Sequence, residues 1–309
     1  MRIPHIATIS LLAISFQSQA QNFLPSIQEY QKVQAQGRTS VSLEVENDSL
    51  LLKRDDGFYT SGNHVIVRQS LTTPQQSIAY VWHLGQDLYT ASDIKLRPNQ
   101  IQQFDHPYAA WLYAGVFKEL QNSDGSGSKF GLELGCLGPC AAGEWTQTNL
   151  HRLFNQPLPQ AWSTQLKQEW GAVVHAEISP AAWRLSADSD FGTRFGARVG
   201  NIFTDAKTEL TWRYGRLNTS VDAPGSFMFG RAELKLVGYN ASLQGGYFRD
   251  QKLTINPNRV VPELEFGYQY RGDTWGFYAS VLRRGSEIKE LSNAKGAQNF
   301  AKLQLTYAM

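Results

Sequence analysis

Alternation of apolar and polar residues with a period of two is the feature that most limits how this chain can fold. It recurs along nearly the whole sequence, for example at 41–46, 130–136, 209–214, 263–270 and 302–307. In each of these segments, large apolar residues alternate with charged, small polar or glycine residues. A period of two places the two sets on opposite faces of a β-sheet, so the sequence predicts an all-β protein.

Residues 1–20 have the composition of an export signal. Arg2 precedes an apolar stretch at 6–16, and the small residues Ser18 and Ala20 follow it, as before a cleavage site. A helix needs about 20 apolar residues to cross a bilayer, so this stretch is too short for a transmembrane span. We therefore predict a signal peptide and an exported mature chain.

An exported chain of alternating strands can form a water-soluble sandwich or an outer-membrane barrel. In a barrel the apolar set faces lipid and the polar set faces the lumen. The aromatic content of 12% and a last strand that runs almost to the final residue favour the barrel. The ending Tyr-Ala-Met counts against it, because many such barrels end on an aromatic residue. We predict a polar N-terminal extension or short helix at 21–39, and one domain at 40–309: a transmembrane antiparallel β-barrel of about twelve strands.

Net charge and cysteine content limit the partners. A formal net charge of +2 lacks the basic excess that nucleic-acid binding needs, so we expect no nucleic-acid partner. The two cysteines, Cys136 and Cys140, have no second ligand pair beside them, which argues against a zinc site. Export would permit a disulfide between them, and the sequence leaves its formation open.

Counting strands places the reactive residues at one rim of the barrel. If the first strand runs outward, Asn47 and Asp48 lie at its outer end, and the returning strand begins near Thr60. The long loops at 89–106 and 137–164 then lie at the same rim, since long loops face outside and short turns face the periplasm. We expect these polar groups to gather at the outer end.

The second of these loops carries a predicted helix that covers the barrel mouth. Its sequence from Gly143 to Phe154 has helix-forming composition, and Pro157 follows it. Gln147 and His151 are four residues apart, so both project from one face of this helix. A loop folded back over the barrel would present that face to the wall.

The sequence is similar to the outer-membrane lipid A 3′-O-deacylase family over about 40–309. The similarity rests on ENDSL (46–50), DGFYTSG (56–62), QDLYT (86–90), DHPYAAWLYAG (105–115), LGPCAAGEWTQTNLH (137–151) and the weaker RRGSE (283–287). Any one of these segments alone is weak, whereas the Asn-Asp, Tyr-Thr-x-Gly and Gln-x-x-x-His elements together are fairly specific.

This resemblance implies a twelve-stranded barrel whose site lies between the wall and a loop helix, near the outer leaflet. It implies Ca²⁺-dependent hydrolysis of the ester that holds the 3′ acyl group of lipid A. By the resemblance, His151 is the general base with Gln147 beside it, and Asn47, Thr60 and Lys95 complete the catalytic set. The implied partners are lipid A or lipopolysaccharide and the lipid of the outer membrane, and we expect a monomer.

The residue types suit this chemistry. A neutral imidazole can take a proton from water near neutral pH, and Lys95 could add positive charge beside an oxyanion. Ca²⁺ prefers oxygen ligands, which Asp48 and Asn47 can supply. Two departures stand out, because the family motif usually carries Arg where this chain has His106, and it does not require the two cysteines.

Two other functions remain open at this point. The chain could be a non-catalytic porin or surface barrel, with Asn47 and Asp48 as an ordinary turn pair and Lys95 as a surface cation. It could also be an outer-membrane phospholipase that uses a Ser-His pair, although no serine has a distinctive context. His64, His83 and His175 fall in strand patterns and are predicted to be lumen or packing residues.

Overall fold

The computed structural model describes residues 23–51, 57–218, 223–248, 253 and 255–309. The predicted signal peptide at 1–20 lies outside these residues. The described part begins with the helix α2 (Ile27–Gln36), and the first strand starts at Arg38, two residues before the predicted start of the barrel. The extension therefore contains a short helix, which is one of the two forms predicted for it.

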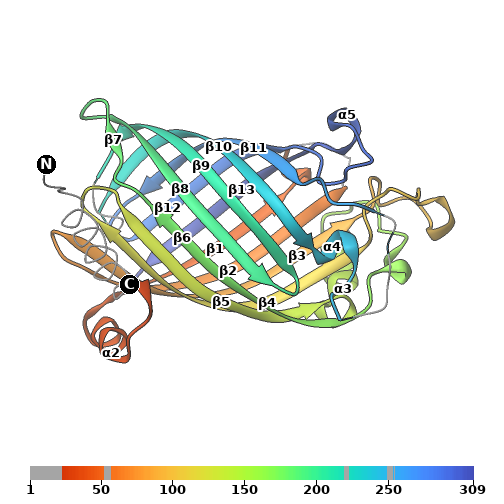
Figure 1. Cartoon of the computed structure of the whole chain (residues 1–309), viewed down its shortest axis with the longest axis horizontal. Helices are drawn as coiled ribbons and strands as arrows, with labels where there is room; N and C mark the ends of the chain where they lie inside the picture. Colours follow the sequence, from red (N-terminus) through yellow and green to blue (C-terminus); the bar gives the residue numbers. More distant parts are fainter. Residues whose placement is uncertain (1–22, 52–56, 219–222, 249–252, 254) are drawn as a thin grey trace, which may run out of the picture.

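Twelve antiparallel strands close into a barrel (Figure 1). They are β1 (Arg38–Asn47), β2 (Phe58–Thr72), β3 (Gln76–Thr90), β4 (Ala109–Asn122), β5 (Gly127–Leu137), β6 (Glu169–Ser179), β8 (Ser189–Gly200), β9 (Phe203–Arg216), β10 (Gly225–Asn240), β11 (Val260–Arg271), β12 (Trp275–Arg284) and β13 (Gln298–Ala308). The pairs β1–β13 and β6–β8 complete the ring, and the two-residue strand β7 (Trp183–Arg184) extends only β8. The predicted fold class and strand number are confirmed.

The two ends of the barrel differ in their connections. One end, called the loop end here, carries the long connections at 91–108 and 138–168, together with the helices α3 (Gly143–Leu153), α4 (Ala241–Gln244) and α5 (Asn293–Gly296). The other, the turn end, carries short connections such as 73–75, α2 and the carboxyl terminus (Figure 1). Because outer-membrane barrels place long loops outside and short turns in the periplasm, the loop end is the extracellular end.

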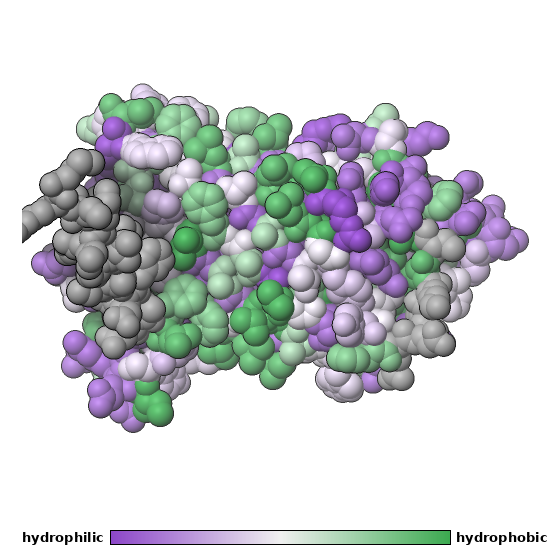
Figure 2. Space-filling model, viewed as in Figure 1, coloured by the Kyte–Doolittle hydropathy of each residue, from purple (hydrophilic) through white to green (hydrophobic). Residues whose placement is uncertain are grey.

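The outward face of the wall is apolar across its middle. Large apolar side chains are exposed there on many strands, among them Leu43, Leu84, Leu134, Phe266 and Leu305. Figure 2 shows hydrophobic side chains across the middle of the wall on the face in view. No helix in the described part of the chain is long and apolar enough to cross a bilayer. The alternation in the sequence thus reflects a wall with lipid on one side and a polar interior on the other.

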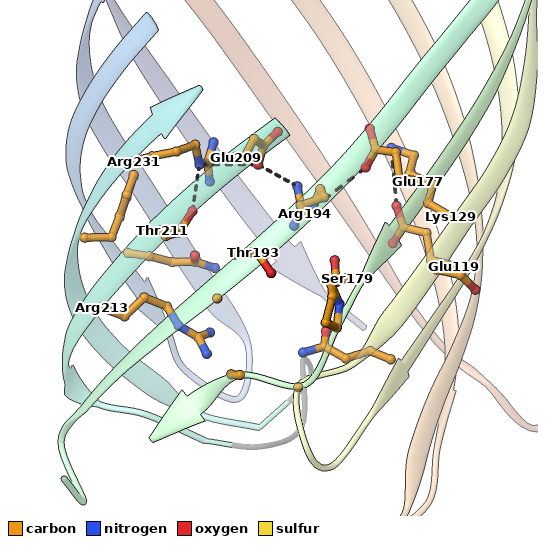
Figure 3. Close-up of a pocket in the computed structure, with 18 of the residues that line it drawn as sticks. Glu119, Lys129, Glu177, Ser179, Thr193, Arg194, Glu209, Thr211, Arg213 and Arg231 are labelled. Atoms are coloured by element: carbon orange, nitrogen blue, oxygen red, sulfur yellow. Dashed lines mark hydrogen bonds and ion pairs between the residues drawn. The ribbon is translucent and has the colours of Figure 1, made fainter. Parts of the chain in front are cut away.

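Ion pairs fill much of the lumen. Arg213 pairs with Asp190 at 2.7 Å, and Arg231 pairs with Glu265 at 2.8 Å. A cavity of about 350 Å³ at the turn end is lined by alternating charges, with Arg194 lying between Glu209 and Glu177 (Figure 3). Strong mutual pairing offsets part of the cost of burying these charges.

Aromatic side chains gather in the lumen toward the loop end. A buried apolar cluster there contains Tyr59, Tyr89, Trp111, Tyr113, Phe203 and Phe300. The rings of Tyr59 and Phe300 lie 5.2 Å apart, and the guanidinium of Arg284 lies over both. These rings narrow the loop end of the lumen, where a cavity of about 210 Å³ remains beside Tyr59 and Arg284.

The strand histidines point into the lumen, as predicted. His64 contacts Glu44 at 2.9 Å and Asp87 at 3.1 Å, and His83 packs edge-on against His64. His175 lies 2.9 Å from Glu133. These three rings are part of the interior packing and charge pairing of the barrel.

The helix α2 lies on the outward face of the wall near the turn end. Lys118 is an outward residue of β4, and it is buried because α2 covers it. Its Nζ lies 2.7 Å from Glu29 of α2, which also accepts a hydrogen bond from the Tyr80 hydroxyl at 2.9 Å. The Tyr30 ring packs edge-on against Tyr80. The extension is thus fixed to the outside of strands β3 and β4.

Candidate functional site

The helix α3 packs one face against the outside of the barrel. Gly143, Gln147 and His151 are the buried residues of this helix, spaced four apart as one face requires. Trp145 and Leu153 are exposed on the other side. The predicted helix is therefore present. Its buried face, which carries Gln147 and His151, is turned toward the outer surface of the barrel wall.

Small residues let this helix approach the wall closely. A Cβ added at Gly143 would lie 2.5 Å from Cβ of Ala110 on β4 and 2.6 Å from the Trp162 ring. Leu88, Ala91, Tyr108, Ala110, Ala141, Ala161 and Trp162 form the buried apolar cluster beneath the loop. Gln86 of β3 also donates a hydrogen bond to Ala141 O at 2.7 Å. A larger residue at 143 would push the helix off the wall.

The amide of Gln147 has a fixed orientation. Trp162 lies in the short helix η4 (Trp162–Thr164) and donates from Nε1 to Gln147 Oε1 at 2.8 Å. The side chain of Gln147 is almost completely buried, and its Nε2 has no hydrogen-bond partner among the described residues. Burying an unpaired donor is costly. The Nε2 group is therefore a buried donor on the face of α3 that is turned toward the wall.

The imidazole of His151 is also oriented by the loop. Its Nδ1 lies 2.5 Å from Pro157 O, and a carbonyl can only accept, so Nδ1 carries the proton. The lone pair of the neutral ring is then on Nε2. This is the tautomer that a general base on this helix requires.

A β-bulge in β2 gives Thr60 its position. Pairing with β3 is regular on both sides but shifts between Tyr59 and Ser61, so Thr60 is the extra residue. Tyr59 points into the lumen, whereas Thr60 bonds to Thr90 Oγ1 at 2.6 Å. Thr90 follows the outward residue Leu88, which packs under the α3 loop. Thr60 thus lies on the outward face, where regular alternation would have placed it in the lumen.

Asn47 and Asp48 form a turn at the loop end of β1. Asn47 Oδ1 accepts from the backbone N–H of Ser49 at 2.7 Å, and Asp48 Oδ2 accepts from that of Gly57 at 3.1 Å. Asp48 is buried. Alternation places Asn47 on the outward face of β1, next to the strand that carries Thr60. These contacts are those of a turn pair, and they hold a carboxylate and an amide at this rim.

Lys95 lies in the connection at 91–108, on the exposed surface of the loop. Its backbone N–H donates to Asp93 Oδ1 at 2.9 Å. Asp105 organises this loop, because it accepts from the backbone N–H of Ser92 at 2.7 Å and from its hydroxyl at 2.8 Å. The described contacts bring Gln147 to Trp162, and Thr60 to Thr90, but they do not bring Lys95 to the buried face of α3.

His106 is buried at the loop end. Its ring stacks on Tyr89 at 5.2 Å, and its Nδ1 lies 2.7 Å from Pro107 O. Burial lowers its pKa below the ordinary 6.5, although the carbonyl contact acts in the opposite direction. This residue stands where the family motif usually carries Arg, so this chain has a buried imidazole there.

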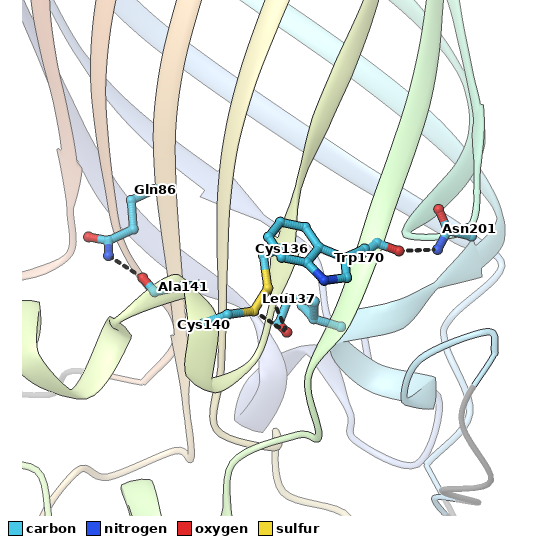
Figure 4. Close-up of a disulfide and its surroundings, with 7 residues drawn as sticks. All are labelled: Gln86, Cys136, Leu137, Cys140, Ala141, Trp170 and Asn201. Atoms are coloured by element: carbon cyan, nitrogen blue, oxygen red, sulfur yellow. Dashed lines mark hydrogen bonds between the residues drawn. A yellow bond between two sulfur atoms is a disulfide. The ribbon is translucent and has the colours of Figure 1, made fainter.

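A disulfide joins Cys136 at the end of β5 to Cys140 in η3 (Pro139–Ala141) (Figure 4). The sequence left this pairing open. The bridge closes the short segment through which β5 enters α3, and Ala141 follows directly with its carbonyl bonded to Gln86. It therefore ties the start of the site helix to the wall.

A group of acidic and histidine side chains close enough to bind a metal ion lies in the lumen, away from α3. Among the described residues, the group of this kind is Glu44, Glu46 and His64, which faces the lumen. Lys302 already pairs with both glutamates, so this group carries its own cation. At the outer rim, Asp48 and Asn47 offer the oxygen ligands that Ca²⁺ prefers.

Trp162 and Thr90 are site residues that sequence reasoning missed. Both act through partners far along the chain, since Trp162 is 15 residues from Gln147 and Thr90 is 30 residues from Thr60. No local pattern marks such pairs.

Comparison with known proteins gives a consistent result. The model of a family described as outer membrane protein LpxR matches residues 6–309. The structure resembles LpxR from Salmonella typhimurium with a TM-score of 0.72 and 21% identity, covering 87% of this chain and 99% of that one. It also resembles the β domain of the Bordetella autotransporter BrkA, with a TM-score of 0.49 and 12% identity, covering 88% and 98%. No curated protein matches the sequence.

Proposed function

Because the chain belongs to the family of outer membrane protein LpxR and lies in the bacterial outer membrane, we propose that it hydrolyses the ester holding the 3′ acyl group of lipid A. The observation that carries this proposal is the buried face of α3, where Gln147 and His151 face the outward wall of the barrel. A site on the outside of the wall at the extracellular end is open to a glycolipid of the outer leaflet, and a site in the lumen would not be.

The side chains fit water-mediated ester hydrolysis. His151 Nε2, which carries the lone pair, takes a proton from the attacking water. The Nε2 amide group of Gln147 donates toward the oxygen on which negative charge develops. Thr60 and Asn47, on the outward faces of β2 and β1, position the substrate. Lys95, on the exposed connection at 91–108, contributes positive charge at the same rim.

The residues at the rim fit a bound Ca²⁺. Asp48 supplies a buried negative charge, and Asn47 adds an amide oxygen, with backbone carbonyls of the same turn as further donors. When bound, the ion would polarise the ester carbonyl as a Lewis acid. The charge of Asp48 would hold it beside the wall on which the ester lies.

A diffusion pore is less well supported. Buried aromatic rings, including Tyr59, Trp111 and Phe300, narrow the loop end of the lumen. A porin needs a continuous aqueous channel.

A Ser-His phospholipase is also less well supported. The histidine on the helix facing the outward wall is His151, and its Nδ1 is directed at the backbone carbonyl of Pro157. A serine triad would instead need a group on that nitrogen that stabilises the imidazolium.

The test is deacylation of purified lipid A by the refolded barrel in detergent with Ca²⁺. We expect His151→Ala to lose at least about 100-fold in kcat, the lower range for a general base. Asn149→Ala is the matched control, because Asn149 lies on the exposed side of the same helix. Wild-type turnover by His151→Ala would exclude the proposed base.

The metal requirement is tested separately. A chelator should abolish activity, and added Ca²⁺ should restore it in the wild type but poorly in Asp48→Asn. Undiminished activity in the chelator would exclude Ca²⁺ while leaving the role of His151 intact.

A further inference from the structure

Arg283 interrupts the apolar face of the barrel at the loop end of β12. Its neighbours in sequence point inward, since Leu282 joins the buried cluster and Arg284 lies over the rings of Tyr59 and Phe300. Arg283 must therefore point outward, and its side chain is exposed.

Charged side chains are rare on this face. On the twelve barrel strands, the outward positions with a charge are Lys118, Arg216 and Arg283. Lys118 is covered by α2 and paired with Glu29, and Arg216 ends β9 at the turn end. Arg283 is thus the one outward charge of these strands in their extracellular half. An arginine on a lipid-facing wall is tolerated at the headgroup level and strongly disfavoured deeper in the bilayer.

The guanidinium of Arg283 is held in place without being neutralised. Its Nη1 donates to Asn299 Oδ1 of the neighbouring strand β13 at 2.9 Å. Asn299 is an uncharged acceptor, and no carboxylate pairs with Arg283 in the described part of the chain. The remaining donors of the planar fork are available for a bidentate contact.

Arg283 lies on the same wall as the proposed site. Strand pairing aligns Val281 with Ala301, and Ala301 with Asn47. Val281 is therefore level with Asn47, two strands away. Arg283 lies two residues beyond Val281 along β12, toward the loop end. Strand spacing and rise put the Cα atoms of Arg283 and Asn47 about 12 Å apart. A sugar headgroup spans such a distance between a phosphate and an acyl ester.

We propose that Arg283 binds a phosphate on the sugar headgroup of the glycolipid substrate and so holds the substrate along the outward wall beside Asn47. This inference rests on the proposed function, because it assigns the anchor for that substrate. The chemistry it requires is a phosphate monoester at headgroup height, which a guanidinium binds by two parallel hydrogen bonds.

The experiment compares lipid A that carries its phosphates with lipid A from which they have been removed enzymatically. On the phosphorylated substrate, Arg283→Gln should raise KM about tenfold or more, as expected for loss of a charge-assisted contact, with kcat nearly unchanged. On the dephosphorylated substrate, wild type and variant should have equal KM. Arg216→Gln, which removes an outward arginine from the opposite end of the wall, should behave as wild type on both.

Other outcomes overturn the inference. An unchanged KM for Arg283→Gln on phosphorylated lipid A would exclude it, and so would an equal loss on both substrates. Binding of both lipid A forms to His151→Ala and to the His151→Ala, Arg283→Gln double variant gives a readout without turnover. Failure of the wild type to deacylate either form would refute the proposed function. The binding measurement would still test Arg283 in that case, because selective binding of the phosphorylated form does not depend on turnover.

Discussion

Replacing Trp162 by phenylalanine tests how the site orients Gln147. The change keeps a ring in the buried cluster but removes the Nε1–H that donates to Gln147 Oε1 at 2.8 Å. The amide oxygen would then be buried without its donor, at a cost of about 1–3 kcal/mol. The amide can avoid part of that cost by rotating, which takes Nε2 away from the substrate.

The expected loss in kcat can be calculated if the rotated amide no longer stabilises the transition state. A loss of about 1–3 kcal/mol corresponds to a kcat lower by about five- to 150-fold. We would measure kcat for wild type, Trp162→Phe, Gln147→Ala and the double variant, and confirm folding by the heat-dependent gel mobility of each barrel.

The double variant decides between positioning and packing. If Trp162 acts through Gln147, the change to phenylalanine should alter kcat by less than about twofold once Gln147 is alanine. An equal loss in both backgrounds would show that Trp162 acts through general packing. Wild-type kcat in Trp162→Phe would refute the reasoning altogether.

Three further predictions concern stability, measured by urea unfolding in lipid vesicles. Replacing Cys136 and Cys140 by serine should lower the free energy of unfolding of the loop by about 2 kcal/mol, which is the loop-closure entropy of so short a bridge. Limited proteolysis of α3 should then become faster. Unchanged proteolysis would show that packing alone holds the loop. Burial lowers the pKa of His106 below 6.5, so the unfolded chain binds a proton that the folded state excludes, and stability should fall as the pH drops below about 6.5. His106→Phe, which can keep the ring stacked, should flatten this dependence, and an identical pH profile would contradict the assignment. Glu29→Gln should cost about 1–3 kcal/mol because it leaves Lys118 buried without its carboxylate, and Lys118→Met should restore most of that loss; no loss in Glu29→Gln would mean that α2 does not hold this pair in the membrane.

The fold could be predicted from the sequence because a membrane wall enforces the alternation. Lipid on one side and a polar lumen on the other make each strand repeat with a period of two. The segments 130–136 and 263–270 lie in β5 and β11 as this pattern required. The site helix was also predictable, since its composition and the following prolines fix its ends to within one residue of those observed.

Two features of the structure depart from the alternating pattern and could not be predicted from it: the bulge at Thr60 and the buried outward charge of Lys118. The bulge at Thr60 reverses the side to which this residue points, and no local sequence signal marks it. Lys118 falls at an outward position, and its burial depends on Glu29, 89 residues earlier. A charge at an outward strand position could have been recognised as a sign that something covers or binds it.

The orientation of Lys95 is a feature that strand counting could not predict. Its place in the loop at 91–108 followed from strand counting, and it does lie at the loop end. Its side chain is exposed, however, because loop geometry depends on contacts such as those of Asp105 with Ser92. Strand counting predicts which rim a residue occupies and does not predict which way a loop side chain turns.

Tandem mass spectrometry of lipid A from cells that produce the wild type or His151→Ala tests the central claim most directly. We predict that wild-type cells contain lipid A lacking the 3′-linked acyl group, and that cells with the folded His151→Ala barrel retain it. Lipid A that is identical in the two strains, or that loses an acyl group from a different position, would contradict the proposed reaction.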